Sequence, residues 1–294
     1  MYAEVNGAEL YYEVHGPDGA PAILTLHGGP GISDHAKAVE AFEPLTDEYR
    51  VVAYDHRGCG ASELAPPYSN EQYARDADAL REHLGLGEVV LLGGSYGGFV
   101  AQEFVTTVGT ENVAAVVLRD TAAHGGWDEQ ARETAREKWD DLQAGAFDVP
   151  EVTWAEFQRM MGGEMRSDEE FERVFHAVAP LYAPSFEAFD AEAAREATEA
   201  RNFHHETHNT MFTEEFPEMD YRDALPGVDV PVLVTVGRGD WITPVGASEE
   251  LADLLPDARL EVFEESGHSP NLDQQEAYVA LVREFLADVG YAPD

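Results

Sequence analysis

The stretch 91–100, LLGGSYGGFV, places one serine between two pairs of glycines directly after an apolar run. Glycine is used where the backbone turns sharply or where another segment comes very close. The spacing around Ser95 is G-x-S-x-G, which is typical of a tight turn between a strand and a helix. We therefore expect Ser95 to be presented at the end of a buried strand, and the rest of the chain to build a fold around that strand.

Apolar runs of strand length alternate with helical patterns along much of the chain. Helical patterns cover 70–84 and 98–108, and Asn6-Gly7 predicts an opening hairpin of two antiparallel strands. Because unbroken Val, Leu and Ile strands alternate with helices, we predict an α/β fold whose mostly parallel sheet carries helices on both faces. The expected core strands are 22–26, 51–54, 89–92, 113–118, 231–236 and 260–263.

A long gap separates the fourth and fifth of these strands. Residues 124–220 are helical in pattern, acidic and rich in large apolar residues, and no part of them resembles a parallel core strand. We expect a core formed by 1–122 and 222–294, and a helical cap formed by 123–221. Ligands of open α/β sheets bind at the carboxyl edge of the sheet, which is where we expect the cap to lie.

The composition restricts the kind of partner. The 294 residues include 58 acidic and 18 basic ones, for a formal net charge of −40. So much negative charge argues against nucleic acid or an anionic membrane as a partner. Lys37 and Lys138 are the only lysines. An acidic surface nearly free of lysine suggests a salt-rich cytosol, although an acidic protein of an ordinary organism remains the alternative.

The sequence also predicts a cytoplasmic location. Cys59 is the single cysteine, so a disulfide framework is not expected. The beginning MYAEVNGAEL has neither the basic nor the apolar part of a signal peptide, and we found no apolar run of membrane-spanning length. We expect a small-molecule or short-peptide substrate, while the oligomeric state is not indicated.

A serine hydroxyl becomes a good nucleophile only when a base removes its proton. In the strand–turn–helix architecture an acid and then a histidine follow later in the chain, each just after a strand. Asp240 follows the strand 231–236 and His268 follows 260–263. Asp120, after 113–118, is the rival acid. We favour Asp240 because it occupies the commoner position, and we predict the catalytic set Ser95, Asp240 and His268.

The segment HGGPG, 27–31, follows the first core strand and predicts a loop whose N–H groups face a substrate oxygen. We expect Gly29 and Tyr96 to donate to that oxyanion and Gly28 to contact substrate. His27 is expected to brace the loop rather than act as a second base.

Two further clusters have structural interpretations. In 55–62, DHRGCGAS, we expect Arg57 to brace the loop and Cys59 to fill space. The segment HHETH, 204–208, has Asn209 where the zinc pattern HExxH requires histidine, so we predict no metal site.

The motifs HGGPG, D-x-R-G-x-G-x-S and GGSYGG together resemble the α/β-hydrolase fold and, within it, the proline iminopeptidase family. The resemblance covers the expected core, and it implies a serine enzyme that removes an N-terminal residue, often proline, from short peptides. It implies no metal or organic cofactor. Glu206 is similar to a family glutamate that binds the substrate ammonium, and it is a predicted substrate-binding residue. Trp241, also predicted to bind substrate, stands where many members have a second acidic residue.

Three functions therefore remain open. The first is a proline iminopeptidase-type aminopeptidase that forms an acyl-enzyme. Trp241 favours the second, a carboxylesterase, lactonase or other small-acyl hydrolase with the same catalytic set. The third is a ligand-binding receptor with little turnover, which the complete set of catalytic residues disfavours.

Overall fold

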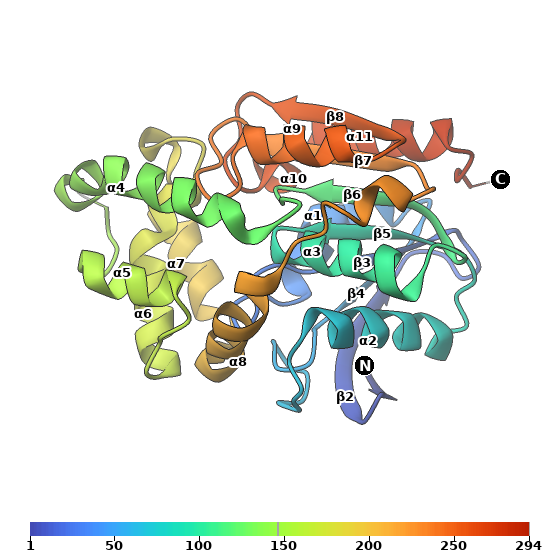
Figure 1. Cartoon of the computed structure of the whole chain (residues 1–294), viewed down its shortest axis with the longest axis horizontal. Coiled ribbons are helices and arrows are strands. Elements are labelled where there is room, and N and C mark those ends of the chain that lie inside the picture. Colours follow the sequence, from blue (N-terminus) through green and yellow to red (C-terminus); the bar gives the residue numbers. More distant parts are fainter. Residues whose placement is uncertain (146, 294) are drawn as a thin grey trace.

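A computed structural model describes residues 1–145 and 147–293. Its centre is an eight-stranded sheet in the order β1-β2-β4-β3-β5-β6-β7-β8 (Figure 1). β1 and β2 pair antiparallel and β2 is antiparallel to β4, while all other neighbours are parallel. The strands are β1 (Tyr2–Val5), β2 (Ala8–His15), β3 (Ala22–Leu26), β4 (Arg50–Tyr54), β5 (Val89–Gly94), β6 (Val113–Arg119), β7 (Val232–Gly237) and β8 (Ala258–Phe263).

The sequence predicted the six core strands, β3 to β8, within two residues at each end. The opening hairpin also forms where Asn6-Gly7 indicated, since both residues have positive φ, 47° and 75°, as a two-residue turn of this kind requires. The six core strands are fully or largely apolar because helices cover both faces of the sheet.

Two hydrophobic clusters lie on the two faces. One includes side chains of α2 (Asn70–His83), α3 (Tyr96–Glu103) and α9 (Val245–Leu254). The other includes side chains of α1 (Ala36–Phe42) and α11 (Gln275–Asp288), which follows the short α10 (Pro270–Asp273). The predicted α/β-hydrolase fold is confirmed by this arrangement.

The chain between β6 and β7 is helical, and its helices gather at one end of the sheet (Figure 1). Three of them, α4, α5 and α6, share a third cluster, the cap cluster, in which Trp139, Phe157 and Phe171 are buried together. Ile32 and Trp241, from loops of the core, also belong to this cluster and join the two parts. The helices are α4 (Asp128–Ala144), α5 (Trp154–Met161), α6 (Asp168–Val178), α7 (Ala191–Glu199) and α8 (His205–Thr210).

Among the described residues, no helix is both long and apolar enough to span a membrane.

Candidate active site

Ser95 lies in the turn between β5 and α3. Its φ of 54° and ψ of −123° are strained for a residue with a side chain. The turn is fixed from both sides, since the Ser95 N–H donates to the Arg119 oxygen at 2.8 Å and the Ser95 oxygen accepts from the Gly98 N–H at 2.9 Å. Such strain persists only where the surrounding structure enforces it, and it is common at functional sites.

The glycines around Ser95 are required by close packing. A Cβ on Gly97 would collide with the main-chain oxygen of Leu26, and one on Gly93 would collide with that of Gly97. The helix α3 therefore begins in close contact with β3 and β5, and Ser95 lies at the carboxyl edge of the sheet.

His268 and Asp240 extend from Ser95 in a hydrogen-bonded chain. His268 Nε2 lies 2.9 Å from Ser95 Oγ, and His268 Nδ1 lies 2.8 Å from Asp240 Oδ2. Asp240 also accepts from the Thr243 hydroxyl at 2.7 Å and from the main-chain N–H groups of Ile242 and Thr243. Three residues that are far apart in the sequence are thus aligned as a nucleophile, a base and an acid would be.

The pKa values of Asp240 and His268 are shifted in the directions that this alignment requires. Burial raises the pKa of Asp240, but the charge and hydrogen bond of His268 and the bonds from Thr243 outweigh burial and hold it below its usual value. Burial lowers the pKa of His268, yet the Asp240 charge and hydrogen bond outweigh it and leave the pKa raised. With Asp240 ionised, Nδ1 keeps the proton it donates, so Nε2 is free to accept the Ser95 proton.

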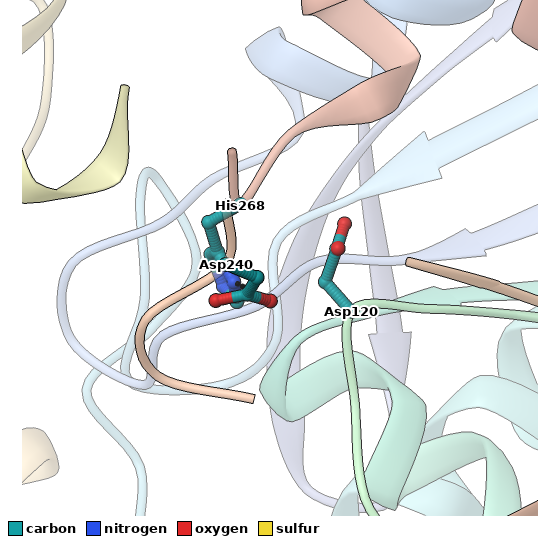
Figure 2. Close-up of side chains that lie close together, drawn as sticks. All are labelled: Asp120, Asp240 and His268. Atoms are coloured by element: carbon teal, nitrogen blue, oxygen red, sulfur yellow. Dashed lines mark hydrogen bonds and ion pairs between the residues drawn. The ribbon is translucent and has the colours of Figure 1, made fainter. Parts of the chain in front are cut away.

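Asp120 lies beside this pair (Figure 2). It is fully buried, and burial raises its pKa to about 7, with the Asp240 charge adding to the effect and Arg119 opposing it. Its Oδ2 accepts from Arg119 Nη1 at 2.7 Å and its Oδ1 accepts from the Gly237 N–H at 3.0 Å. The hydrogen bond to His268 comes from Asp240, so Asp120 is a neighbour of the aligned chain and not a member of it.

Asp120, Asp240 and His268 are also the one group of described His, Cys, Asp and Glu residues whose possible ligand atoms all lie within 4.8 Å of one another. A cation there would have to break the Asp240–His268 bond and face the guanidinium of Arg119. The histidines of 204–208 point to separate acceptors: His204 to Gly60, His205 to Asp168 and His208 to Met160. These donor sets fit a metal poorly.

The HGGPG loop passes directly over Ser95. A Cβ on Gly28 would stand only 3.0 Å from Ser95 Cβ and from the Gly94 oxygen, so any larger residue would crowd the turn at Ser95. His27 braces the loop, since its Nε2 accepts from the His56 N–H at 3.0 Å and its Nδ1 lies 2.8 Å from the Gly28 oxygen. Within the described part of the chain, the N–H groups of Gly29 and Tyr96 have no hydrogen-bond acceptor and remain open for a ligand.

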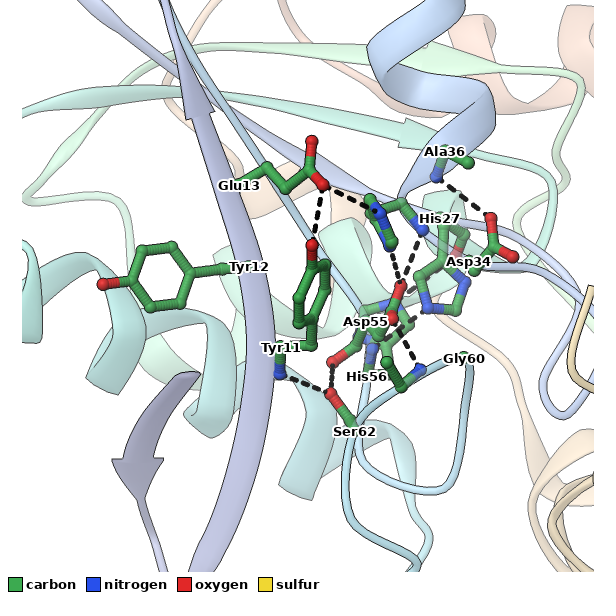
Figure 3. A network of polar contacts seen from close by, with 12 residues as sticks. Tyr11, Tyr12, Glu13, His27, Asp34, Ala36, Asp55, His56, Gly60 and Ser62 are labelled. Atoms are coloured by element: carbon green, nitrogen blue, oxygen red, sulfur yellow. Dashed lines mark hydrogen bonds and ion pairs between the residues drawn. The ribbon is translucent and has the colours of Figure 1, made fainter. Parts of the chain in front are cut away.

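The neighbouring loop 55–62 is a structural support. Asp55 accepts from the His35 main chain at 2.7 Å and ring at 2.8 Å, and from the Ala61 N–H at 2.8 Å (Figure 3). Arg57, also buried, donates two hydrogen bonds to the Asp76 carboxylate, at 2.6 and 2.8 Å. Cys59 is buried and accepts from the Gly31 N–H at 3.3 Å. The predicted bracing role of Arg57 is confirmed.

A cavity of about 320 Å³ opens above Ser95, between the sheet edge and the cap. Gly28, Gly29, Ser95, Tyr96 and His268 line it, as do apolar side chains from both parts of the chain. The apolar residues include Ile32, Phe99, Trp127, Met161, Phe175, Phe212, Phe216 and Ile242.

Two predicted substrate-binding residues lie elsewhere. Neither Glu206 nor Trp241 is among the described residues that line the cavity. Glu206 is exposed, because α8 turns the following Thr207 and His208 inward. Trp241 is fully buried in the cap cluster, with its ring 5.4 Å from that of Tyr182 and 5.9 Å from that of Phe157. Of the three predicted substrate contacts, only Gly28 lies at the cavity, so this cavity does not support a substrate contact by Glu206 or Trp241.

The sequence interpretation missed two cavity residues, Lys37 and Arg201. Lys37 follows the glycine loop by six residues and is one of two lysines in the chain, which was the available signal. Arg201 follows α7 in the cap, and nothing in its local sequence marked it.

Comparison with known proteins shows what the chain is similar to. A family model described as alpha/beta hydrolase fold matches residues 21–275. Proline iminopeptidase PfmaB from Pestalotiopsis fici is 34% identical over 287 residues, which cover 97% of this chain and 98% of that protein. A proline iminopeptidase from Lactobacillus helveticus is 26% identical, with 95% of each chain covered. A solved esterase from Thermogutta terrifontis is 27% identical, with a TM-score of 0.68 and coverage of 96% and 94%.

Proposed function

The chain belongs to the α/β-hydrolase family, and on that premise we propose that it is a serine hydrolase that cleaves the acyl bond of a small substrate through an acyl-enzyme on Ser95. The observation that carries this proposal is the hydrogen-bonded chain from Ser95 Oγ through His268 to Asp240, at 2.9 and 2.8 Å.

Each group has a role in the proposed reaction. His268 Nε2 takes the proton of Ser95 as the hydroxyl attacks the acyl carbon, and Asp240 stabilises the imidazolium that forms. The N–H groups of Gly29 and Tyr96 hold the oxyanion of the tetrahedral intermediate. His268 then gives its proton to the leaving group, and it accepts a proton from the water that hydrolyses the acyl-enzyme.

Two substrate classes are supported by different observations. The names of the relatives, the first at 34% identity, favour a proline iminopeptidase. That activity needs a carboxylate for the substrate ammonium, and Asp34 is the cavity carboxylate without an ion pair among the described residues, since Asp128 pairs with Arg132 at 2.6 Å. The unpaired cations Lys37 and Arg201 in the same cavity oppose an ammonium and favour a neutral or anionic ester or lactone.

The test compares initial rates on L-prolyl-p-nitroanilide and p-nitrophenyl butyrate, with Ser95→Ala as control. Release of nitrophenol in a burst equal to the enzyme concentration supports an acyl-enzyme. Prolyl cleavage that Asp34→Asn abolishes, with butyrate cleavage retained, supports the iminopeptidase. Ester cleavage without prolyl cleavage supports the small-acyl hydrolase. No turnover of either substrate, with the same rates in Ser95→Ala, contradicts the proposal and favours a receptor.

A further inference from the structure

The cavity above Ser95 is lined by two cations that form no ion pair within the described chain. Lys37, from α1, and Arg201, two residues after α7, both line it. Within residues 1–145 and 147–293, neither side chain has a carboxylate oxygen within 4.0 Å or forms a hydrogen bond. The chain has 58 acidic residues against 18 basic ones, so unpaired cations are not expected by chance in an enclosed site.

The other charged groups of the cavity are already engaged. Arg119 is paired with Asp120 at 2.7 Å, and Asp128 is paired with Arg132 at 2.6 Å. Asp34 also lines the cavity and acts on both cations, but it forms no ion pair among the described residues, and its Oδ1 accepts from the Ala36 N–H at 3.0 Å (Figure 3). Among the lining residues, one carboxylate without an ion pair therefore stands against two cations without one.

The charge of Arg201 acts on Lys37. Burial lowers the pKa of Lys37, the charge of Arg201 lowers it further, and Glu40 opposes this. Burial also lowers the pKa of Arg201, while Asp34 and Tyr182 raise it. Two like charges in a poorly solvated place repel each other, and an anion that binds near both would relieve this cost.

The position of Arg201 is fixed by packing. Its guanidinium carbon lies 4.9 Å from the centroid of the Phe175 ring, which also lines the cavity. Stacking on an aromatic face leaves the N–H groups at the edge of the guanidinium plane free to donate. An arginine held in this way offers a preformed fork for a carboxylate.

We infer that Lys37 and Arg201 form a subsite for a carboxylate of the substrate, so that the natural substrate is an anionic acyl compound held in the cavity that contains Ser95. This inference rests on the proposed hydrolase function and names its substrate class. The carboxylate can belong to the acyl part, as in a dicarboxylic acid monoester, or to the leaving part, as in a short peptide with a free carboxyl end.

The test uses p-nitrophenyl butyrate as a neutral reporter and compares inhibition by adipate with inhibition by adipamide, at one fixed potassium chloride concentration. The two inhibitors match in size and differ in charge. We expect adipate to bind about 10- to 100-fold more tightly, the range for a charge-assisted hydrogen bond. In Lys37→Met/Arg201→Met the ratio of the two inhibition constants, for adipamide and for adipate, should fall to about one. Because the readout is a ratio within one protein, a general loss of activity cancels.

Lys138→Met/Arg166→Met is the matched control, since it removes the same two charges outside the cavity. It should keep the preference of the unmodified protein. Equal inhibition by adipate and adipamide in the unmodified protein overturns the inference, as does a preference that survives in Lys37→Met/Arg201→Met.

Two substrate pairs then locate the carboxylate. Faster cleavage of mono-p-nitrophenyl adipate than of p-nitrophenyl hexanoate places it in the acyl part. Faster cleavage of prolyl-alanine than of prolyl-alaninamide places it in the leaving part. If neither the reporter ester nor L-prolyl-p-nitroanilide is hydrolysed, the proposed function fails on its own, and calorimetric titration of the same proteins with adipate and adipamide still decides the subsite.

Discussion

Arg119, the last residue of β6, donates a hydrogen bond of 2.8 Å to the main-chain oxygen of His268. The same nitrogen, Nη1, donates to the Asp120 carboxylate at 2.7 Å. The backbone of His268, the candidate base, is thereby hydrogen-bonded to β6, which lies next to β5, the strand that precedes Ser95. This contact explains how His268, in a loop near the end of the chain, is held at hydrogen-bonding distance from Ser95, which directly follows β5.

Replacement of Arg119 tests whether its hydrogen bond to the His268 oxygen positions the base. We expect Arg119→Met to lower kcat roughly 10- to 100-fold, because a shift of about 1 Å in a catalytic group can cost that much. It should also lower the free energy of unfolding by about 3 kcal/mol, since Asp120 is left buried without its partner. Urea unfolding and ester hydrolysis measure the two effects. Arg119→Met/Asp120→Asn should regain stability but not kcat, and full recovery of kcat would refute the positional role.

Replacement of Ser95 tests the nucleophile. Ser95→Ala should lower kcat on the order of 10⁶-fold, because other serine triads lose about that factor. The alanine keeps the Cβ, so the midpoint of thermal unfolding should change by less than about 4 °C, the shift expected for about 1 kcal/mol in a chain of this size. A variant that retains a tenth of the activity would exclude Ser95 as the nucleophile.

The two buried carboxylates next to His268 should differ in their effect. Asp240→Asn removes the acceptor of the His268 Nδ1 proton and should lower kcat by about 10⁴-fold, as in related triads. Asp120→Asn imitates the protonated form of Asp120 and should lower kcat by less than about 10-fold, since its contacts are with Arg119 and Gly237. Equal losses in both variants would show that the two carboxylates share the role of the acid.

The pH profile provides an independent measure of Asp120. Neutral His268 is the active form, so kcat/KM should rise with pH through the pKa of His268, which Asp240 and Asp120 hold above its usual value. Asp120→Asn removes one negative charge that favours the imidazolium, and the rise should therefore move to lower pH. Rates of ester hydrolysis between about pH 5 and pH 9 show the shift. A shift to higher pH would contradict the assigned influence of Asp120.

The sequence was sufficient for the sheet and for the aligned chain because both depend on local patterns. Gly97 and its neighbours mark the turn at Ser95, and Asp240 and His268 each follow a strand that the apolar pattern reveals. These residues lie at strand ends, whose place in a parallel sheet follows from the order of the elements.

The lining of the cavity could not be predicted in the same way. Which face of a short helix turns inward depends on tertiary packing, and α8 buries Thr207 and His208 while it exposes Glu206. Trp241 follows Asp240 directly, yet its ring packs against Phe157 of the cap rather than into the cavity. Lys37 and Arg201 line the same cavity only because α1 and the segment after α7 both face it, and no spacing in the sequence indicates this.

The net charge of −40 predicts that potassium chloride stabilises the fold. Salt weakens surface ion pairs such as Arg222–Asp220, which would lower stability, but it also screens repulsion among the 58 acidic residues. Repulsion should dominate, because 18 basic residues can pair with fewer than half of the acidic ones. The midpoint of thermal unfolding should therefore rise between about 0.1 M and about 2 M potassium chloride, where the screening length falls to a few ångströms. Tetramethylammonium chloride separates the causes: an equal rise indicates screening, whereas a rise specific to potassium indicates cations held by surface carboxylates. A midpoint that is constant or falls over this range would show that mutual repulsion of the carboxylates does not limit stability.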